Sequence, residues 1–225
     1  MVVIFDFDGI IVDTEQIHYN AFQRVLNPLG LGYSWEEYMD KYIGFDDRDA
    51  FREVFRATGK EIKPENLDDM INMKAAFFEQ IVRQGVTAYP GVISLLTKLK
   101  GNVPLALCSG ALRSDILPIL DNMAIRDVFD VLVTAEDVKE SKPDPQSYIL
   151  AVKKLAEIFP GKDITADRCI AIEDTPAGIA SALKAGVSVL AVTNSFTADR
   201  LTGAVYVTDT LESVTLELLA KLVDK

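Results

Sequence analysis

The feature that most constrains the fold is a set of short apolar runs, rich in β-branched residues, that recur along the chain. Their apolarity is continuous rather than alternating, which is typical of strands buried on both faces of a sheet. Helical patterns separate these runs, and this alternation favours a parallel sheet with helices on both faces. The predicted strands are Val2–Phe7, Val103–Cys108, Val131–Thr134, Ile170–Glu173 and Val187–Val192.

The later helices carry clear start and stop signals. We expect Asp144 to be the N-cap of a long helix, with Pro145 in its first turn. Thr175 and Pro176 are expected to open the next helix in the same way, and Gly186 to end it. The predicted fold class is therefore α/β, with a Rossmann-like parallel sheet as its core.

The stretch from Glu15 to Gly85 breaks this rhythm, because it is helical in period and shows no strand pattern. We predict an inserted α-helical domain over residues 15–87, within an α/β core formed by residues 1–14 and 88–225. The turn after Val12 and the Pro- and Gly-containing segment Ala88–Gly91 mark the two boundaries. Two such crossings between domains form a natural hinge.

The charge balance limits the classes of partner. Lys and Arg total 23 against 34 Asp and Glu, so the formal net charge is −11, and no segment concentrates the basic residues. Nucleic acid and anionic membranes are therefore not expected as partners. An anionic substrate would need a local positive site, either a metal ion or a few placed donors.

The chain is predicted to be cytoplasmic. Its apolar runs are far shorter than the ~20 residues needed to span a bilayer. The first residues, from Met1, lack a basic leader and read as the start of a strand rather than a signal peptide. Cys108 and Cys169 both lie in or beside apolar runs. We interpret them as small buried residues in a reducing compartment, rather than as a zinc site or a disulfide.

Carboxylates stand at the end of the first predicted strand. In a regular strand, residues two apart point to the same side, whereas a loop allows other directions. We expect Asp6 to face a ligand. We expect Asp8 to lie on a loop, which Gly9 allows to turn. Open parallel sheets bind their ligands at this carboxyl edge. Turn formation alone would explain an Asp at a strand end, but not Asp6 inside an apolar run.

Polar clusters follow three other predicted strands. Each is weak when taken alone, because Ser-Gly is common in turns and Glu-Asp is common at helix entrances. Together they place polar groups at one edge of the sheet. The clusters are Ser109-Gly110, Lys142-Pro143 and Glu173-Asp174-Thr175.

These four ordered motifs resemble those of the haloacid dehalogenase-like superfamily. The resemblance covers nearly the whole chain and is strongest to the branch with a small helical cap, which holds β-phosphoglucomutase and many sugar-phosphate phosphatases. It implies a haloacid dehalogenase-like core with the inserted helical domain as its cap. It also implies an enzyme that transfers a phosphoryl group.

The resemblance implies a role for each core motif. Asp6 would be the nucleophile that carries an aspartyl-phosphate, and Asp8 the general acid and base. That role requires Asp8 to be protonated part of the time, so we expect burial and nearby negative charge to raise its pKa. Ser109 and Lys142 would assist phosphoryl transfer, joined by the backbone N–H groups of Gly110 and of the loop at Phe7.

A Mg²⁺ ion is the implied cofactor. Asp6 and Asp174 would be its side-chain ligands, together with the backbone carbonyl of Asp8, and Glu173 would support the ion from beside or behind. The ion and Lys142 would supply the local positive site that an acidic chain requires.

Residues of the cap are predicted with alternatives. His18 resembles a histidine near the site in β-phosphoglucomutase, but a partly exposed helical position is an equally good interpretation. Residues 44–48 resemble a cap loop whose arginine contacts a distal phosphate, although with one additional residue. Arg48 is thus either a substrate contact or an ordinary surface ion pair. Lys74 either faces the cleft or lies on a solvated helix face.

The predicted function is a Mg²⁺-dependent phosphatase that acts on a small phosphorylated metabolite, above all a sugar phosphate. The alternative is a mutase of the β-phosphoglucomutase type. The mutase has a lysine three positions after the serine that corresponds to Ser109, and this chain has Leu112 there. The next residue, Arg113, contacts either the substrate or the helix face. A dehalogenase needs no second acid or metal, and a non-catalytic binding protein would not need Asp6. The exact ester and the oligomeric state are left open.

Overall fold

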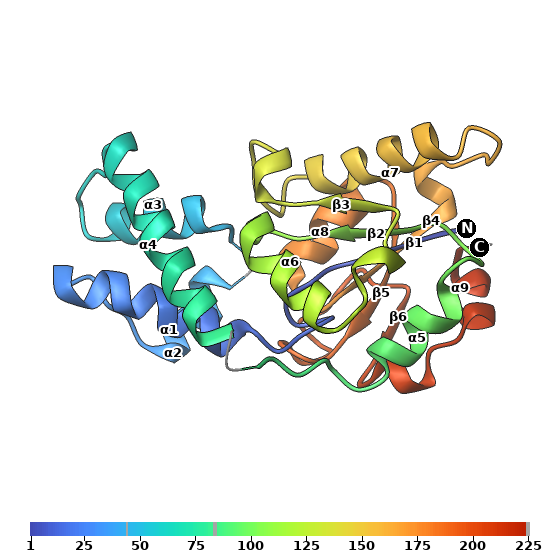
Figure 1. The fold of residues 1–225 in the computed structure, drawn as a ribbon, viewed down its shortest axis with the longest axis horizontal. Coiled ribbons are helices and arrows are strands. Elements are labelled where there is room, and N and C mark those ends of the chain that lie inside the picture. The colour runs from blue at the N-terminus through green and yellow to red at the C-terminus, as the bar shows by residue number, and fades with distance from the viewer. Residues whose placement is uncertain (44, 83–84, 224–225) are drawn as a thin grey trace.

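In the computed structural model, which describes residues 1–43, 45–82 and 85–223, six parallel strands form one sheet in the order β3-β2-β1-β4-β5-β6 (Figure 1). This order reverses direction between β1 and β4, which is where open sheets of this kind bind ligands. The strands are β1 (Val2–Phe5), β2 (Leu105–Cys108), β3 (Val131–Val133), β4 (Cys169–Glu173), β5 (Ser188–Val192) and β6 (Tyr206–Thr208).

The predicted α/β fold is confirmed, and all five predicted strands are present with ends that differ by one or two residues. Strand β6 has no counterpart among the predicted strands. This strand has three residues, is partly exposed and pairs only with β5 at the sheet edge. Its pattern is therefore too short and too polar to resemble a strand buried on both faces.

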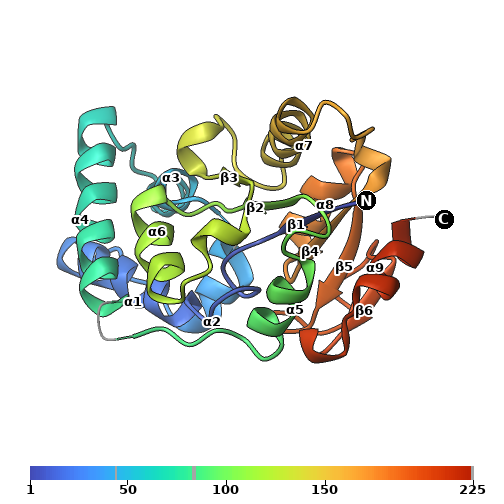
Figure 2. The same ribbon diagram turned by 45° about the vertical axis from the view of Figure 1, so that its right-hand side comes forward.

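Two layers of helices bury the two faces of the sheet (Figures 1 and 2). Alternate strand residues point to opposite faces, so that Val3 and Phe5 pack under α5, α6 and α9, whereas Val2 and Ile4 pack under α7 and α8. The helices of this part are α5 (Val92–Leu99), α6 (Arg113–Asn122), α7 (Gln146–Ile158), α8 (Pro176–Lys184) and α9 (Leu216–Val223).

The helix ends agree with the sequence signals, with one exception. Thr175 caps α8 by accepting a hydrogen bond from the Gly178 N–H, and Gly186 follows the helix with a positive φ. Pro145, rather than Asp144, is the N-cap of α7, which corrects the prediction. The Asp144 carboxylate instead accepts from the N–H of Gln146 in the turn before the helix.

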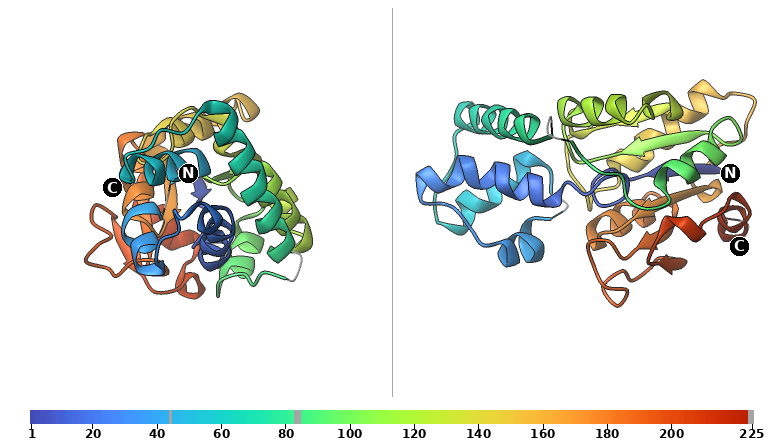
Figure 3. Two further views of the ribbon diagram at one scale, coloured as in Figure 1. Left: turned by 90° about the vertical axis from the view of Figure 1, so that its left-hand side faces the viewer. Right: turned by 60° about the horizontal axis from the view of Figure 1, so that its bottom comes forward.

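The helices between β1 and β2 lie to one side of the sheet and have a hydrophobic core of their own (Figure 3). No strand lies between Glu15 and Val82 among the described residues, as predicted. Tyr38–Tyr42 form a π-helical turn within this part. Its helices are α1 (Glu15–Leu26), α2 (Trp35–Glu37), α3 (Asp47–Ala57) and α4 (Pro64–Val82).

This helical unit also packs against the sheet unit. Phe78 and Val82 of α4 belong to the same buried cluster as Ile116 and Ile119 of α6. The two segments that connect the units run side by side, because Val12 and Ala88 form an antiparallel bridge.

Short 3-10 turns complete the described elements. They cover Asn27–Leu29, Arg126–Val128, Ala135–Asp137, Ala166–Arg168 and Leu211–Ser213. Over the part of the chain that the structure describes, none of the helices combines the length and the apolarity needed to cross a membrane.

Candidate active site

Three carboxylates meet at the carboxyl edge of the sheet, between β1 and β4. Asp6 follows β1, Glu173 ends β4 and Asp174 comes next along the chain. Parallel pairing of β1 with β4 sets Phe5 opposite Ile172, and this register brings the carboxylates together. One oxygen from each lies within 4.8 Å of the others, and all three residues are buried.

Lys142 joins this cluster from the loop before α7. Its Nζ donates to Oδ1 of Asp6 at 2.6 Å and to Oε1 of Glu173 at 2.6 Å, and also to the Cys108 carbonyl at 3.2 Å. The two carboxylates raise the pKa of Lys142 although burial lowers it, so the ammonium stays charged.

Glu173 is held firmly behind Asp6. Oε1 accepts from the Tyr148 hydroxyl at 2.7 Å as well as from Lys142, and Oε2 accepts from the Asp174 N–H at 3.2 Å. Gly178 of α8 leaves the space that this carboxylate occupies, because a Cβ there would overlap it. Glu173 therefore orients Lys142 from behind.

The arrangement fits a divalent cation. Among the described residues, three carboxylates of this cluster face a single lysine, so the cluster carries excess negative charge. Burial, followed by the charges of neighbouring carboxylates, raises the pKa of Asp6 and of Asp174 well above the usual range. Oδ1 of Asp174 is buried without a hydrogen-bond partner. A hard cation that binds oxygen ligands would satisfy both the charge and this oxygen.

The loop after β1 approaches Asp174 closely. Gly9 has φ +77°, and a Cβ there would overlap Oδ2 of Asp174, so only glycine fits this turn without displacement. The Asn194 side chain holds the loop by donating to the Gly9 carbonyl at 2.6 Å. Ser195 donates to Oδ2 of Asp174. The loop position predicted for Asp8 is confirmed, since β1 ends at Phe5.

Asp8 accepts two hydrogen bonds from α1 and its N-cap. The Thr14 hydroxyl and the Nε2 atom of His18, at 3.1 Å, both contact Oδ1 of Asp8. Burial raises the pKa of Asp8, but His18 and Thr14 outweigh it and the net pKa is lowered. The expected rise of the Asp8 pKa is therefore wrong for this geometry, because the contacts with His18 and Thr14 outweigh burial.

Lys74 and His18 form a buried network with the acids around them. Lys74 lies at 2.8 Å from both Nδ1 of His18 and Oδ1 of Asp47, and at 3.8 Å from Asp115 of α6. Lys74 is fully buried, so the solvated helix face is wrong. His18 is buried as well and stacks on Phe78, so the partly exposed position is also wrong.

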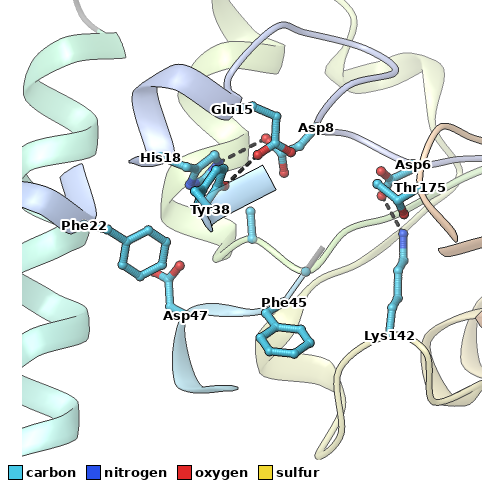
Figure 4. A pocket seen from close by; sticks show the side chains of 12 residues that line it. Asp6, Asp8, Glu15, His18, Phe22, Tyr38, Phe45, Asp47, Lys142 and Thr175 are labelled. Atoms are coloured by element: carbon cyan, nitrogen blue, oxygen red, sulfur yellow. Dashed lines mark hydrogen bonds and ion pairs between the residues drawn. The ribbon is translucent and has the colours of Figure 1, made fainter. Parts of the chain in front are cut away.

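A cavity of about 50 Å³ lies between the helical unit and the sheet edge. Figure 4 shows Asp6 and Lys142 at one end, Asp8 with Glu15 in the middle and Asp47 with Phe22 at the far end. Tyr38 donates to Glu15 at 2.6 Å, and burial, followed by the charge of Asp8, raises the pKa of Glu15.

Of Phe7, Ser109 and Gly110, which are predicted to bind the phosphoryl oxygens, only Gly110 is among the described residues that line this cavity. Gly110 lines the cavity beside Ala111. The hydroxyl of Ser109, at the end of β2, accepts from the N–H of Ala111 at 2.9 Å. The Phe7 side chain is fully buried in the core, so only its main chain faces the loop.

The structure places the two predicted arginines away from this cavity. Arg48 binds the Asp46 carboxylate and donates to the Ala135 carbonyl at 3.1 Å, so it joins the helical unit to the sheet unit through an ion pair, one of the two predicted alternatives. Arg113 pairs with Asp137 at 2.8 Å, beside the end of β3. Gly44 of the predicted cap loop lies outside the described residues.

Sequence reasoning did not identify Tyr148, Asp47, Asn194 and Ser195. The two residues after β5 could have been found, because Asn194 and Ser195 follow a predicted strand at the same sheet edge. Tyr148 lies in α7, and only the fold shows that its hydroxyl reaches Glu173. Both cysteines are buried and free, as predicted.

The comparisons with known proteins agree with this geometry. The chain is 27% identical over 187 residues to a phosphorylated carbohydrates phosphatase from Thermotoga maritima. The matched region covers 82% of this chain and 81% of the relative. It is also 27% identical to β-phosphoglucomutase from Bacillus subtilis, over 96% of this chain and 92% of the relative.

A solved structure has the same fold. A CbbY variant from Rhodobacter sphaeroides in complex with xylulose 1,5-bisphosphate superimposes with a TM-score of 0.85 at 23% identity, covering 97% of this chain and 98% of that one. The sequence model of the haloacid dehalogenase-like hydrolases matches residues 3–192. The expected resemblance is confirmed, and the chain belongs to the haloacid dehalogenase-like hydrolase family.

Proposed function

We propose that this protein is a Mg²⁺-dependent phosphatase that hydrolyses monoesters of small phosphorylated metabolites, above all sugar phosphates, through a phosphoaspartate intermediate. The observation that carries the proposal is the pairing of Asp6 with Lys142 beside the unsatisfied Asp174 carboxylate. The similarity to a phosphatase of phosphorylated carbohydrates supports the substrate class.

Asp6 would act as the nucleophile. Its carboxylate attacks phosphorus, the bond from phosphorus to the ester oxygen breaks, and the aspartyl-phosphate forms. Lys142 holds Oδ1 of Asp6 and neutralises charge beside the incoming phosphoryl group. Ser109 and the backbone N–H groups at Gly110 and Phe7 would bind the phosphoryl oxygens.

Asp8 would move the protons. It gives a proton to the departing alcohol, then removes one from the water that attacks phosphorus and releases phosphate and free Asp6. His18 and Thr14 hold the Asp8 carboxylate in the resting state, which favours its role as the base. The lowered pKa means that the acid form depends on the charge of the bound substrate.

Mg²⁺ would be held by the carboxylates of Asp6 and Asp174 and by the main-chain carbonyl of Asp8. When bound, the ion neutralises the phosphoryl charge as a Lewis acid. Glu173 would support this set through its contacts with Lys142 and the Asp174 N–H. Retention of both Asp8 and Asp174 favours phosphate chemistry over a dehalogenase, and retention of Asp6 favours an enzyme over a binding protein.

We propose residues 15–87 as a cap domain on a core formed by residues 1–14 and 88–225. A cavity of about 50 Å³ has room for little more than water, so a sugar phosphate enters only when the cap moves away from the core. The paired connections at Val12 and Ala88 would serve as the hinge. The two free, buried thiols are consistent with a cytoplasmic setting.

The test is release of inorganic phosphate from a panel of sugar monophosphates and p-nitrophenyl phosphate, with Mg²⁺ present. We expect turnover by the native protein, none by Asp6→Asn, and unchanged turnover by Asp127→Asn, an exposed matched control. Absence of phosphate release across the whole panel would overturn the proposal.

The second candidate is a phosphosugar mutase, which the similarity to β-phosphoglucomutase favours. The same panel separates the two functions when sugar products are measured as well. Conversion of β-glucose 1-phosphate to glucose 6-phosphate without phosphate release would identify the mutase.

A further inference from the structure

The cavity wall farthest from Asp6 contains a buried acid with an unused oxygen. Asp47, the first residue of α3, is only 7% exposed and lines the cavity beside Phe22 (Figure 4). Its Oδ1 accepts from Lys74 at 2.8 Å, whereas its Oδ2 is buried without a hydrogen-bond partner. A buried carboxylate oxygen of this kind costs free energy unless a donor reaches it.

The charge of this region is negative. Among the described residues that line the cavity, Lys142 is the only lysine or arginine, and it lies at the opposite end beside Asp6. Glu15 and Asp8 line the middle. Lys74 is fully buried behind the wall and is already shared between Asp47, Asp115 and His18. A second anionic group placed here would meet like charge.

Arg48 does not compensate for this charge. Asp46 engages the guanidinium of Arg48, which also donates to the carbonyls of Ala135 and Val138 at 3.1 and 3.3 Å. Neighbouring residues in a helix point about 100° apart, so the turn of α3 that directs Asp47 into the cavity directs Arg48 elsewhere.

The proposed chemistry decides which part of a substrate meets Asp47. Asp8 must reach the ester oxygen, and the phosphoryl group must lie against Asp6 and Lys142. The alcohol part therefore extends past Asp8 toward the end of the cavity where Asp47 lies.

We infer that Asp47 is a specificity residue that selects monophosphate esters whose alcohol carries hydroxyl or ammonium donors at its far end, and that rejects a second phosphate. This inference rests on the proposed phosphatase function and deepens it. It also tells against the mutase, because moving a phosphoryl group between two hydroxyls of one sugar passes through a bisphosphate.

The experiment compares four esters with the native protein and Mg²⁺: glucose 6-phosphate, glucosamine 6-phosphate, glucose 1,6-bisphosphate and p-nitrophenyl phosphate. We expect kcat/KM for both monophosphates to exceed that for the bisphosphate by at least about tenfold. A further preference for glucosamine 6-phosphate over glucose 6-phosphate would identify ammonium as the better donor, and equal rates would identify hydroxyl.

The variant Asp47→Asn tests the residue itself. We expect it to lower the ratio of kcat/KM for the monophosphates to kcat/KM for the bisphosphate by about tenfold, chiefly through KM, without an equal loss of kcat for all four esters. Glu53→Gln is the matched control, because it removes one charge from the same helix at an exposed ion pair with Arg56. Its substrate preference should equal that of the native protein.

A structural role for Asp47 would give a different result. If Asp47→Asn lowers kcat equally for all four esters, the residue acts through Lys74 and His18 and the inference is overturned. Equal use of bisphosphate and monophosphates by the native protein would overturn it as well.

A binding measurement separates this inference from the proposed function. Thermal shifts of Asp6→Asn with glucosamine 6-phosphate and with glucose 1,6-bisphosphate report binding without turnover. If the native protein hydrolyses none of the esters, the phosphatase proposal fails, and a larger shift with the bisphosphate than with the monophosphate would overturn the specificity inference too. Hydrolysis of p-nitrophenyl phosphate without discrimination between the sugar monophosphates and the bisphosphate overturns the inference alone.

Discussion

The Nζ atom of Lys74 on α4 lies 2.8 Å from Nδ1 of His18 on α1. An ammonium group can only donate, so Nδ1 of His18 accepts and its Nε2 carries the proton. Nε2 lies 3.1 Å from Oδ1 of Asp8, to which it donates. Lys74 thus fixes the tautomer through which the helical unit holds the loop that carries Asp8.

We expect Lys74→Met to destabilise the fold by about 3–5 kcal/mol, because it leaves Asp47 and Asp115 as buried charges without their cation. Urea unfolding followed by circular dichroism measures this loss. Lys41→Met removes an exposed ion pair with Glu37 and should cost less than about 1 kcal/mol. A similar, small effect for both variants would contradict the importance of the buried network.

Asp115 makes the stability depend on pH. Burial raises its pKa from 3.8 to about 6, against the lowering effect of Lys74. The folded state therefore binds this proton more tightly than the unfolded state, so stability is lost as pH rises from about 4 to 6. Asp115→Asn removes this titration. Between pH 4 and pH 6, the free energy of unfolding of the variant should therefore rise by about 3 kcal/mol relative to that of the native protein.

Urea unfolding of both proteins at pH 4, 5, 6 and 7 measures this difference. Asp121→Asn changes an exposed acid on the same helix and should follow the native curve at every pH. A constant difference between Asp115→Asn and the native protein would show that Asp115 has no raised pKa.

Removal of metal should change the order of stability between the native protein and Asp174→Asn. Without metal, the variant should be the more stable, because it removes a carboxyl group whose pKa is raised by burial and then by the charges of Asp6 and Glu173. Mg²⁺ should stabilise the native protein but not the variant. At a Mg²⁺ concentration one hundred times the Kd for the ion, the free energy of unfolding of the native protein should rise by about 2.7 kcal/mol. Tm in EDTA and in MgCl₂ reports both effects. Asp163→Asn, at an exposed ion pair, should respond to Mg²⁺ as the native protein does.

Gly9→Ala should lower kcat/KM for p-nitrophenyl phosphate by about 100-fold or more, because its Cβ overlaps Asp174 and displaces the Asp8 loop. Gly59→Ala is a matched control, since Gly59 also has positive φ but nothing lies within 4 Å of its Cβ position. Both variants carry the same backbone strain. Equal activity in the two would mean that the close approach of Gly9 to Asp174 is not required.

The sequence alone determined the sheet and the acidic edge. Continuous apolar runs indicate strands buried on both faces, and the carboxyl ends of parallel strands must meet at one edge. Asp6, Lys142 and Asp174 therefore came together as expected, although the first and the last are 168 positions apart in the chain. The positions of Gly9 and Thr175 followed from local turn and cap chemistry.

Only the tertiary structure decided what faces the cavity. Asp47 and Arg48 are adjacent, and the rotation of α3 that turns one inward is set by the packing of Phe51 and Val54 in the core of the helical unit. Lys74 is buried because two distant acids, Asp47 and Asp115, compensate its charge. The orientation of Asp47 and the burial of Lys74 depend on contacts between segments that are distant in the sequence. The energies of those contacts cannot be read from a local sequence pattern.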